Sequence, residues 1–248
     1  MGKFMADLHI HSVLSPCGSL EMSPKKIVEK AKNLNLNLIS ITDHNSIANS
    51  IVSQKIAQKS GIDYIFGMEV QTEEEVHVLT YFNNFNDLYD VWKIVYDKLP
   101  EIKNNPDFFG DQVIVDEDEN IVGYEEKLLI NSSKISFKEL FYIVKEKNGV
   151  FIPAHIDRES FSVISQLGFI PKDIEIKFIE ISYSKERNDF LSNYPYYLKY
   201  SFVSFSDAHF LDDIGRSYTI FEYKDENSNL LNKVFNEKNK ITIKRRFQ

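Results

Sequence analysis

Short apolar runs alternate along the chain with segments whose apolar residues recur at helical spacing, a pattern typical of alternating strands and helices. The predicted strands are about 4–9, 37–42, 63–70, 76–82, 150–155, 178–182, 202–207 and 218–222. The predicted helices are about 24–34, 46–59, 85–99, 136–147, 157–167, 185–192 and 229–239. This alternation predicts an α/β protein with a parallel sheet.

Polar residues mark the ends of several predicted helices. Ser23 followed by Pro24 is typical of an N-cap and the first helical position. Ser136 and Glu139 have the spacing of a capping box, and Asp157 can cap the short helix that follows it. Gly61 is placed where a helix would end.

The alternation is interrupted at about residues 101–134, which we interpret as an insertion in a single domain of residues 1–248. Within it, 112–116 and 120–124 flank the acidic tip Glu117-Asp118-Glu119, which predicts a β-hairpin. We expect the tip to be a solvated turn rather than a cation site. The basic end Lys244-Arg245-Arg246 is also expected to be solvated.

The charge and cysteine content narrow the possible functions. The formal net charge of −8 disfavours loose binding to long nucleic acid or to anionic membranes, although a short phosphate ester drawn to bound cations remains compatible. Cys17 is the only cysteine, so the chain cannot form an internal disulfide, which fits a reducing compartment. No apolar run approaches the length of a membrane helix, and a cytoplasmic location is the expectation.

All six histidines lie in or beside apolar runs. His9 and His11 are separated by one residue, and side chains alternate along a strand, so both imidazoles face the same side and can bind one metal ion together. The other four are His44, His77, His155 and His209, and five of the six lie at or near the end of a predicted strand. Only a closed barrel brings so many strand ends to one mouth, so we expect an irregular TIM-like barrel.

Carboxylates accompany these histidines. Asp207 lies two residues before His209, and Glu69 follows Gly67-Met68 at a strand end. Asp43 directly precedes His44 and is either a ligand or a group that orients one. Asp7, two residues before His9, either orients that ring or lies in the interior.

The set is too large for one tetrahedral ion, which takes four ligands. A carboxylate such as Glu69 can bridge two metals, and imidazole with carboxylate suits zinc, manganese or iron. Arg158 is a candidate for binding a substrate phosphate, or else forms a surface ion pair. Arg216 is a weaker candidate of the same kind.

In their order along the chain, these residues resemble the PHP (polymerase and histidinol phosphatase) family of metal-dependent phosphoesterases. The matching pieces are Asp7-Leu8-His9-Ile10-His11, Thr42-Asp43-His44, Gly67-Met68-Glu69-Val70, His77, Pro153-Ala154-His155 and Ser206-Asp207-Ala208-His209. The resemblance implies an irregular (β/α)7 barrel with two or three divalent metal ions. It implies three sets of ligands: His9, His11, Glu69 and Asp207; Glu69, His77 and His155; and His44 with His209.

The sequence departs from the family pattern at one ligand position. Family members often have a His or Asp five or six residues after the histidine pair, where this chain has Pro16 and Cys17. A thiolate can bind zinc or iron, so Cys17 is a candidate metal ligand. Alternatively Glu21 reaches the site, or the third site is weak or empty.

We therefore expect hydrolysis of a small phosphate ester by attack of a metal-bound hydroxide. Asp43, His209 or water are the candidates for protonating the leaving group. The alternatives are a nuclease acting on nucleic-acid ends and a non-catalytic regulatory protein that binds metal or phosphate. An amidohydrolase would need a bridging lysine, and no lysine lies at a convincing strand end.

Overall fold

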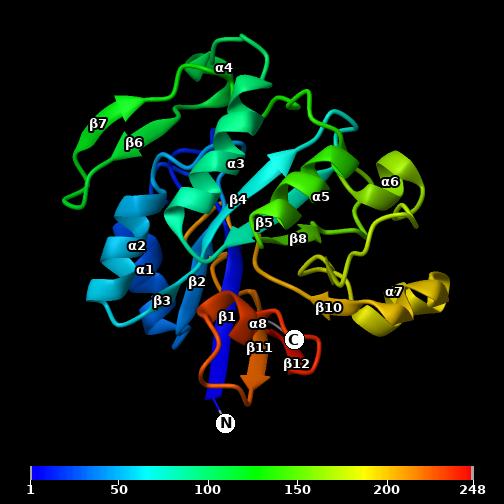
Figure 1. Cartoon of the computed structure of the whole chain (residues 1–248). Coiled ribbons are helices and arrows are strands. Elements are labelled where there is room, and N and C mark those ends of the chain that lie inside the picture. Colours follow the sequence, from blue (N-terminus) through cyan, green and yellow to red (C-terminus); the bar gives the residue numbers. More distant parts are fainter. Residues whose placement is uncertain (1, 247–248) are drawn as a thin grey trace.

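The computed structural model describes residues 2–246, and its longest strand, β1 (Gly2–Ile10), lies at the centre of a five-stranded sheet. β1 pairs in parallel with β2 (Leu38–Ile41), which pairs in parallel with β3 (Asp63–Tyr64). On its other side β1 pairs antiparallel with β11 (Ser217–Tyr223), and β12 (Lys240–Arg245) follows antiparallel. In Figure 1, β1 rises from the N-terminus at the lower edge into the body of the molecule.

The remaining strands form smaller sheets. β4 (Phe66–Gln71), β5 (His77–Phe82) and β8 (Val150–Pro153) form an antiparallel sheet. β9 (Phe178–Glu180) and β10 (Ser201–Val203) pair in parallel. The predicted parallel sheet is therefore wrong for β4, β5 and β8, and also for β11, which pairs antiparallel with β1. The link between β4 and β5 is too short for a helical crossover, so these strands form a hairpin.

Continuous strand pairing does not close a barrel within residues 2–246, but single backbone contacts connect the sheets. A bridge between His44 and Glu69 links the segment after β2 to β4. The Ile156 amide donates to the Glu180 carbonyl at 2.9 Å, and the His11 amide donates to the Ala208 carbonyl at 2.9 Å. The sheets thus follow one another around a common interior. The links between them fall at or next to predicted site residues, except at Glu180, which was not predicted.

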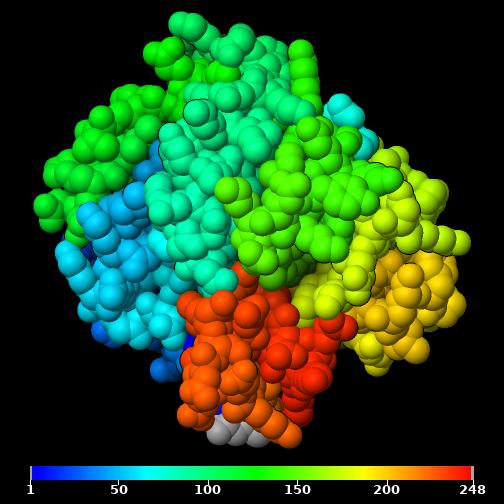
Figure 2. All heavy atoms as spheres, in the orientation of Figure 1, coloured from blue at the N-terminus to red at the C-terminus, as the bar shows by residue number. Residues whose placement is uncertain are grey.

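Helices cover the outside of these sheets. The larger ones are α1 (Pro24–Asn33), α2 (Ser50–Lys59), α3 (Phe85–Asp97) and α5 (Phe137–Glu146), and the shorter ones are α6 (Val163–Leu167), α7 (Arg187–Asn193), α8 (Leu230–Val234) and the 3-10 helix η1 (Pro195–Lys199). Ser23 and Ser136 cap α1 and α5 as predicted. Figure 2 shows α2, α3 and α5 forming much of one face. Among the described residues, no helix is both long and apolar enough to cross a membrane.

Three local predictions are corrected by the structure. Asp157 does not cap α6, because its carboxylate accepts hydrogen bonds from the amide and hydroxyl of Ser182; the helix begins later, with Ser162 as its cap. The predicted helix at 229–239 is short, spanning only α8. The basic end is not simply solvated: it belongs to β12, where Arg245 donates to the Tyr183 carbonyl at 2.8 Å.

The insertion contains α4 (Pro106–Phe109) and the predicted hairpin, formed by β6 (Val113–Val115) and β7 (Ile121–Tyr124). The buried Asn49 side chain binds β6 like a neighbouring strand, donating to the Val113 carbonyl at 3.0 Å and accepting from the Val115 amide at 3.1 Å. At the tip, Glu117 forms ion pairs with Lys55 and Lys59 of α2. The tip is therefore held against the helix layer.

Candidate metal centre

The histidine pair lies at the end of β1, where strand alternation directs both imidazoles into the interior. His9 and His11 are fully buried, and their Nε2 atoms are 3.3 Å apart. Two imidazole nitrogens at this separation can share one cation between them.

Glu69, from β4, is the central residue of the cluster. Its Oε1 lies 3.3 Å from His9 Nε2, 3.1 Å from His77 Nδ1 and 3.4 Å from His155 Nε2. Its Oε2 lies 3.3 Å from His11 Nε2 and 3.1 Å from His44 Nδ1. One carboxylate thus faces five imidazoles, which come from four different segments of the chain.

Asp207 approaches the same histidine pair from the segment after β10. Its Oδ1 lies 3.3 Å from both His9 Nε2 and His11 Nε2, and 3.7 Å from His209 Nδ1. The structure therefore brings together all six histidines with Glu69 and Asp207.

The donors fit divalent metal ions. Three groups have nitrogen, oxygen or sulfur atoms within 4.8 Å of one another: His9, His11 and Glu69; His44, Glu69 and His77; and His11, Cys17, His44 and His209. Both oxygens of Glu69 and the Nδ1 atoms of His44 and His155 are buried without a hydrogen-bond partner. Buried polar atoms without partners are costly, and a coordinated cation would satisfy those that face it.

Opposite charges separate the pKa values within the cluster. Burial alone lowers the pKa of His11, but Asp207 and Glu69 outweigh it and raise the pKa to about 9. Burial likewise opposes ionisation of Glu69, yet the surrounding imidazoles hold its pKa well below the usual range. Burial lowers the pKa of His44 well below normal and that of His209 to about 4, which keeps both neutral and able to act as ligands.

Glu180, at the end of β9, is a site residue that the sequence reasoning missed. Both of its oxygens lie 3.1 Å from His9 Nδ1, and Oε2 accepts from the His155 amide at 2.9 Å. In the neutral ring this contact favours the tautomer with its hydrogen on Nδ1, so that Nε2 can offer its lone pair to a metal ion. The sequence feature that could have identified Glu180 is its position between two isoleucines in an otherwise apolar predicted strand.

The carboxylates of Asp43 and Asp7 are engaged by other protein groups, as their hydrogen bonds show. The Asp43 carboxylate accepts from the amide and the hydroxyl of Ser12 and from the hydroxyl of Ser15, each at 2.7 Å. Ser15 Oγ in turn lies 3.1 Å from His11 Nδ1. The Asp7 carboxylate accepts hydrogen bonds from the backbone amides of Ser206 and Gly215, and it therefore satisfies backbone groups in the interior.

The two candidate arginines differ in how free their guanidinium groups are to bind a substrate phosphate. Arg158 pairs with Asp207 at the edge of the cluster, and its side chain is 36% exposed. Arg216 donates to the carbonyls of Ser206 and Asp207, pairs with Asp213 and lies over the Tyr183 ring. Its guanidinium is thus engaged in holding the backbone around Asp207.

Cys17 reaches the cluster from the loop after β1. Its sulfur belongs to the group with His11, His44 and His209, although the residue as a whole is exposed. Local burial and the carboxylates of Glu69 and Asp207 raise the pKa of its thiol. Glu21 is exposed and belongs to none of the three groups.

Two residues of the histidine and carboxylate cluster have a left-handed backbone conformation. The φ angle is positive at both His155 and Asp207. Non-glycine residues rarely adopt this region, because the Cβ atom crowds the neighbouring backbone. Such conformations concentrate at functional sites because the surrounding structure must hold them.

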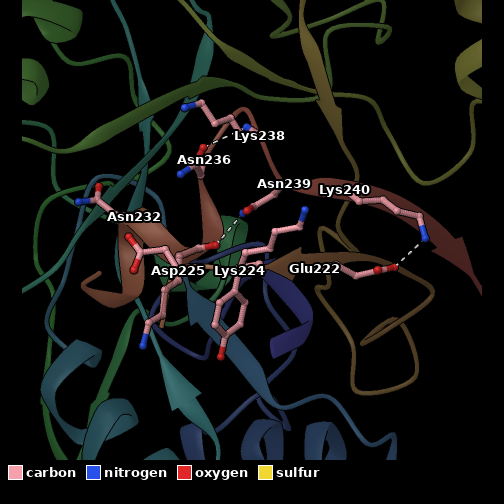
Figure 3. A pocket seen from close by; sticks show the side chains of 10 residues that line it. Glu222, Lys224, Asp225, Asn232, Asn236, Lys238, Asn239 and Lys240 are labelled. Atoms are coloured by element: carbon pink, nitrogen blue, oxygen red, sulfur yellow. Dashed lines mark hydrogen bonds and ion pairs between the residues drawn. The ribbon is translucent and has the colours of Figure 1, made fainter. Parts of the chain in front are cut away.

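A hollow of about 410 Å³ lies away from this cluster, lined by residues including Glu222, Lys224 and Lys238. Figure 3 shows Glu222 beside Lys240, with their ion pair at 3.0 Å. Tyr223 of its wall pairs with Gly2, at the end of β1 remote from His9. The hollow is therefore separate from the histidine cluster.

An α/β fold that gathers imidazoles and carboxylates in this way is typical of proteins that bind divalent metal ions. The PHP domain model matches residues 7–168, so the chain belongs to the PHP domain family of metal-dependent hydrolases. This confirms the resemblance found in the sequence.

Individual relatives are more distant. The uncharacterized protein MJ1587 of Methanocaldococcus jannaschii is 33% identical over 78 residues, which cover 28% of this chain and 45% of that protein. The lesion-specific endonuclease PfuEndoQ of Pyrococcus furiosus has a similar fold, with a TM-score of 0.69 and 20% identity over 94% of this chain and 56% of its own. A two-domain Bacteroides vulgatus protein containing a predicted PHP-like metal-dependent phosphoesterase has a TM-score of 0.55 and 17% identity, covering 97% of this chain and 65% of its own. This chain thus spans about half the length of MJ1587 and of PfuEndoQ.

Proposed function

We propose that this chain hydrolyses a small phosphate ester with the help of two or three divalent metal ions. The arrangement around Glu69 carries the proposal, because one buried carboxylate faced by five imidazoles has the position of a bridging ligand. In the same proposal the ring of sheets is an irregular (β/α)7 barrel and residues 1–248 are one domain.

The proposed ligands fall into three sets, and Glu69 belongs to two of them. His9, His11, Glu69 and Asp207 hold one ion, and Glu69, His77 and His155 hold a second. His44 and His209 with Cys17 hold a third, and the 4.8 Å grouping of these three residues with His11 supports that set. Zinc, manganese and iron all suit these donors.

Bound metals would lower the pKa of a nucleophilic water and neutralise charge on the phosphoryl oxygens. Arg158 adds a cation at the exposed edge, where it can bind the phosphate. We assign Asp43 to positioning, because its oxygens bind Ser12 and Ser15, and Arg216 to holding the backbone at Asp207. His209 is a metal ligand in this proposal, so its ring is not available as an acid, and water is the donor to the leaving group.

A nuclease is the second candidate. The structural similarity to PfuEndoQ, and to an Endonuclease Q complex with a 27-mer duplex carrying an abasic lesion at the active site, favours it. The net charge of −8 favours a small substrate, because nucleic-acid binding depends on positive surface. A cytoplasmic location is part of the first proposal.

The test is hydrolysis by purified protein loaded separately with manganese, zinc or iron. The substrates are a panel of phosphate monoesters and diesters, single-stranded DNA and a duplex with an abasic site. We expect cleavage of a small ester, abolished by His9→Ala and retained by Lys3→Ala, an exposed control on the same strand. Cleavage of DNA alone would favour the nuclease. Ester hydrolysis that survives His9→Ala, or metal binding without any hydrolysis, would contradict the proposal.

A further inference from the structure

The loop between β8 and α6 places an exposed aromatic ring beside the metal centre. The Phe161 ring stacks on the His77 ring, with centroids 4.7 Å apart and an interplanar angle of 18°. Phe161 is nevertheless 38% exposed. Because His77 covers one face of the ring, a ligand can contact Phe161 only through the opposite face or the edge.

The backbone of this loop is held in a left-handed turn at Phe161. Its φ angle is positive, a conformation that is rare for a bulky side chain. The Phe161 carbonyl accepts from the His77 amide at 2.9 Å, and the next residue, Ser162, donates its hydroxyl to the Arg158 carbonyl at 2.7 Å. Core packing does not explain a strained residue whose ring remains exposed, whereas a contact with a ligand would.

Exposure also indicates where a substrate enters. Among the polar side chains that contact Glu69 or Asp207, Arg158 is 36% exposed and His209 is 25% exposed. The side chain of His77 is 10% exposed, and those of His9 and His11 are fully buried. Arg158 and His209 are thus the members of this set that reach solvent furthest, and Phe161, which stacks on His77, is also exposed. The organic part of a bound ester would pass such exposed residues, because the inner histidines are closed to solvent.

We infer that Phe161 determines specificity by stacking on a planar aromatic group that the substrate carries next to its phosphate. A flat apolar ring fixed beside the phosphate position offers an aryl group a stacking partner and a hydrophobic contact. An alkyl group of similar length gains less binding free energy from contact with the same ring, because it cannot stack on it. This inference rests on the proposed phosphoesterase function and narrows its substrate class to aryl-bearing phosphates.

The test uses two unreactive analogues, phenylphosphonate and methylphosphonate, titrated calorimetrically into manganese-loaded protein. Phe161→Ala is expected to weaken phenylphosphonate binding about fivefold to tenfold while changing methylphosphonate binding less than about twofold. Phe161→Tyr should restore binding, and its manganese content should equal that of wild type. Phe169→Ala removes another exposed phenylalanine, just after α6, and should change neither affinity.

Equal weakening for both analogues would overturn the inference, because Phe161 would then act only by supporting His77. Unchanged phenylphosphonate affinity would overturn it as well. Either result leaves the proposed function standing if wild type hydrolyses phosphate esters. Failure of wild type to bind either phosphonate would contradict both proposals.

Discussion

At the residue scale, the chemistry of this protein depends on a few side chains that no single local motif defines. The positions of histidines and acidic residues at the ends of predicted strands were enough to predict the cluster around Glu69. Glu180 was missed because its role depends on β9 lying beside His9, which is a tertiary relation. The sequence did not show that Arg216 binds backbone carbonyls, because arginine donors can serve substrate or structure equally well.

Glu180→Gln is expected to weaken metal binding about 10–100-fold, because the amide no longer fixes His9 as strongly as a carboxylate does. The measurement is metal affinity by competition with a chelator. Glu175→Gln, an exposed glutamate just before β9, is the control and should bind metal as wild type does. Unchanged affinity in Glu180→Gln would show that the contact with His9 is not needed.

Cys17→Ala is expected to reduce the number of metal ions bound per chain, because the thiol would no longer complete the group with His11, His44 and His209. Elemental analysis of the purified variant measures this. Glu21→Gln, which removes the alternative ligand, should leave the count unchanged. The same count in Cys17→Ala as in wild type would exclude Cys17 as a required ligand.

Metal affinity should depend on pH through His11. In the metal-free protein its pKa is raised to about 9, so at pH 7 the ring is protonated and a metal must displace that proton. Apparent affinity should therefore rise at least about tenfold per pH unit from pH 7 towards pH 9, because at His9 too the effect of burial is outweighed by the surrounding carboxylates, which raise its pKa. Affinity that is constant over this range would show that His11 is not a ligand.

At the element scale, strands and helices were predicted best where the apolar pattern is long or a cap is present. α1 and α5 begin where Ser23 and Ser136 predicted. Strand direction was not readable from the pattern, and the β4–β5 hairpin was foreseeable only from its short link. β12 was missed because its few apolar residues lie among lysines and arginines.

The insertion is held by buried amides, which gives a prediction for its stability. Asn49→Ala is expected to lower the free energy of unfolding by about 1–3 kcal/mol. The reason is that the Val113 carbonyl and the Val115 amide lose their buried partner. Asn188→Ala, on the exposed part of α7, is the control and should leave the free energy of unfolding unchanged within experimental error. Denaturant unfolding measures both, and equal effects would contradict the proposed role of Asn49.

At the scale of the whole molecule, separate sheets converge on one interior. β1, β4 and β9 contribute His9, Glu69 and Glu180 to it, and the segments that follow β8 and β10 contribute His155 and Asp207. The sequence predicted this convergence from the recurrence of ligand residues after strands. It could not predict that strand pairing is interrupted at the site, since single bridges such as that between His44 and Glu69 leave no sequence pattern.

The convergence of these segments on shared cations is tested most directly by anomalous X-ray scattering from crystals of the manganese-loaded protein. We predict at least two manganese peaks, each within about 2.5 Å of an oxygen of Glu69, with His9 and His11 coordinating one ion and His77 and His155 the other. Manganese found only elsewhere on the molecule, or no bound manganese, zinc or iron at Glu69 in any loaded crystal, would contradict the account.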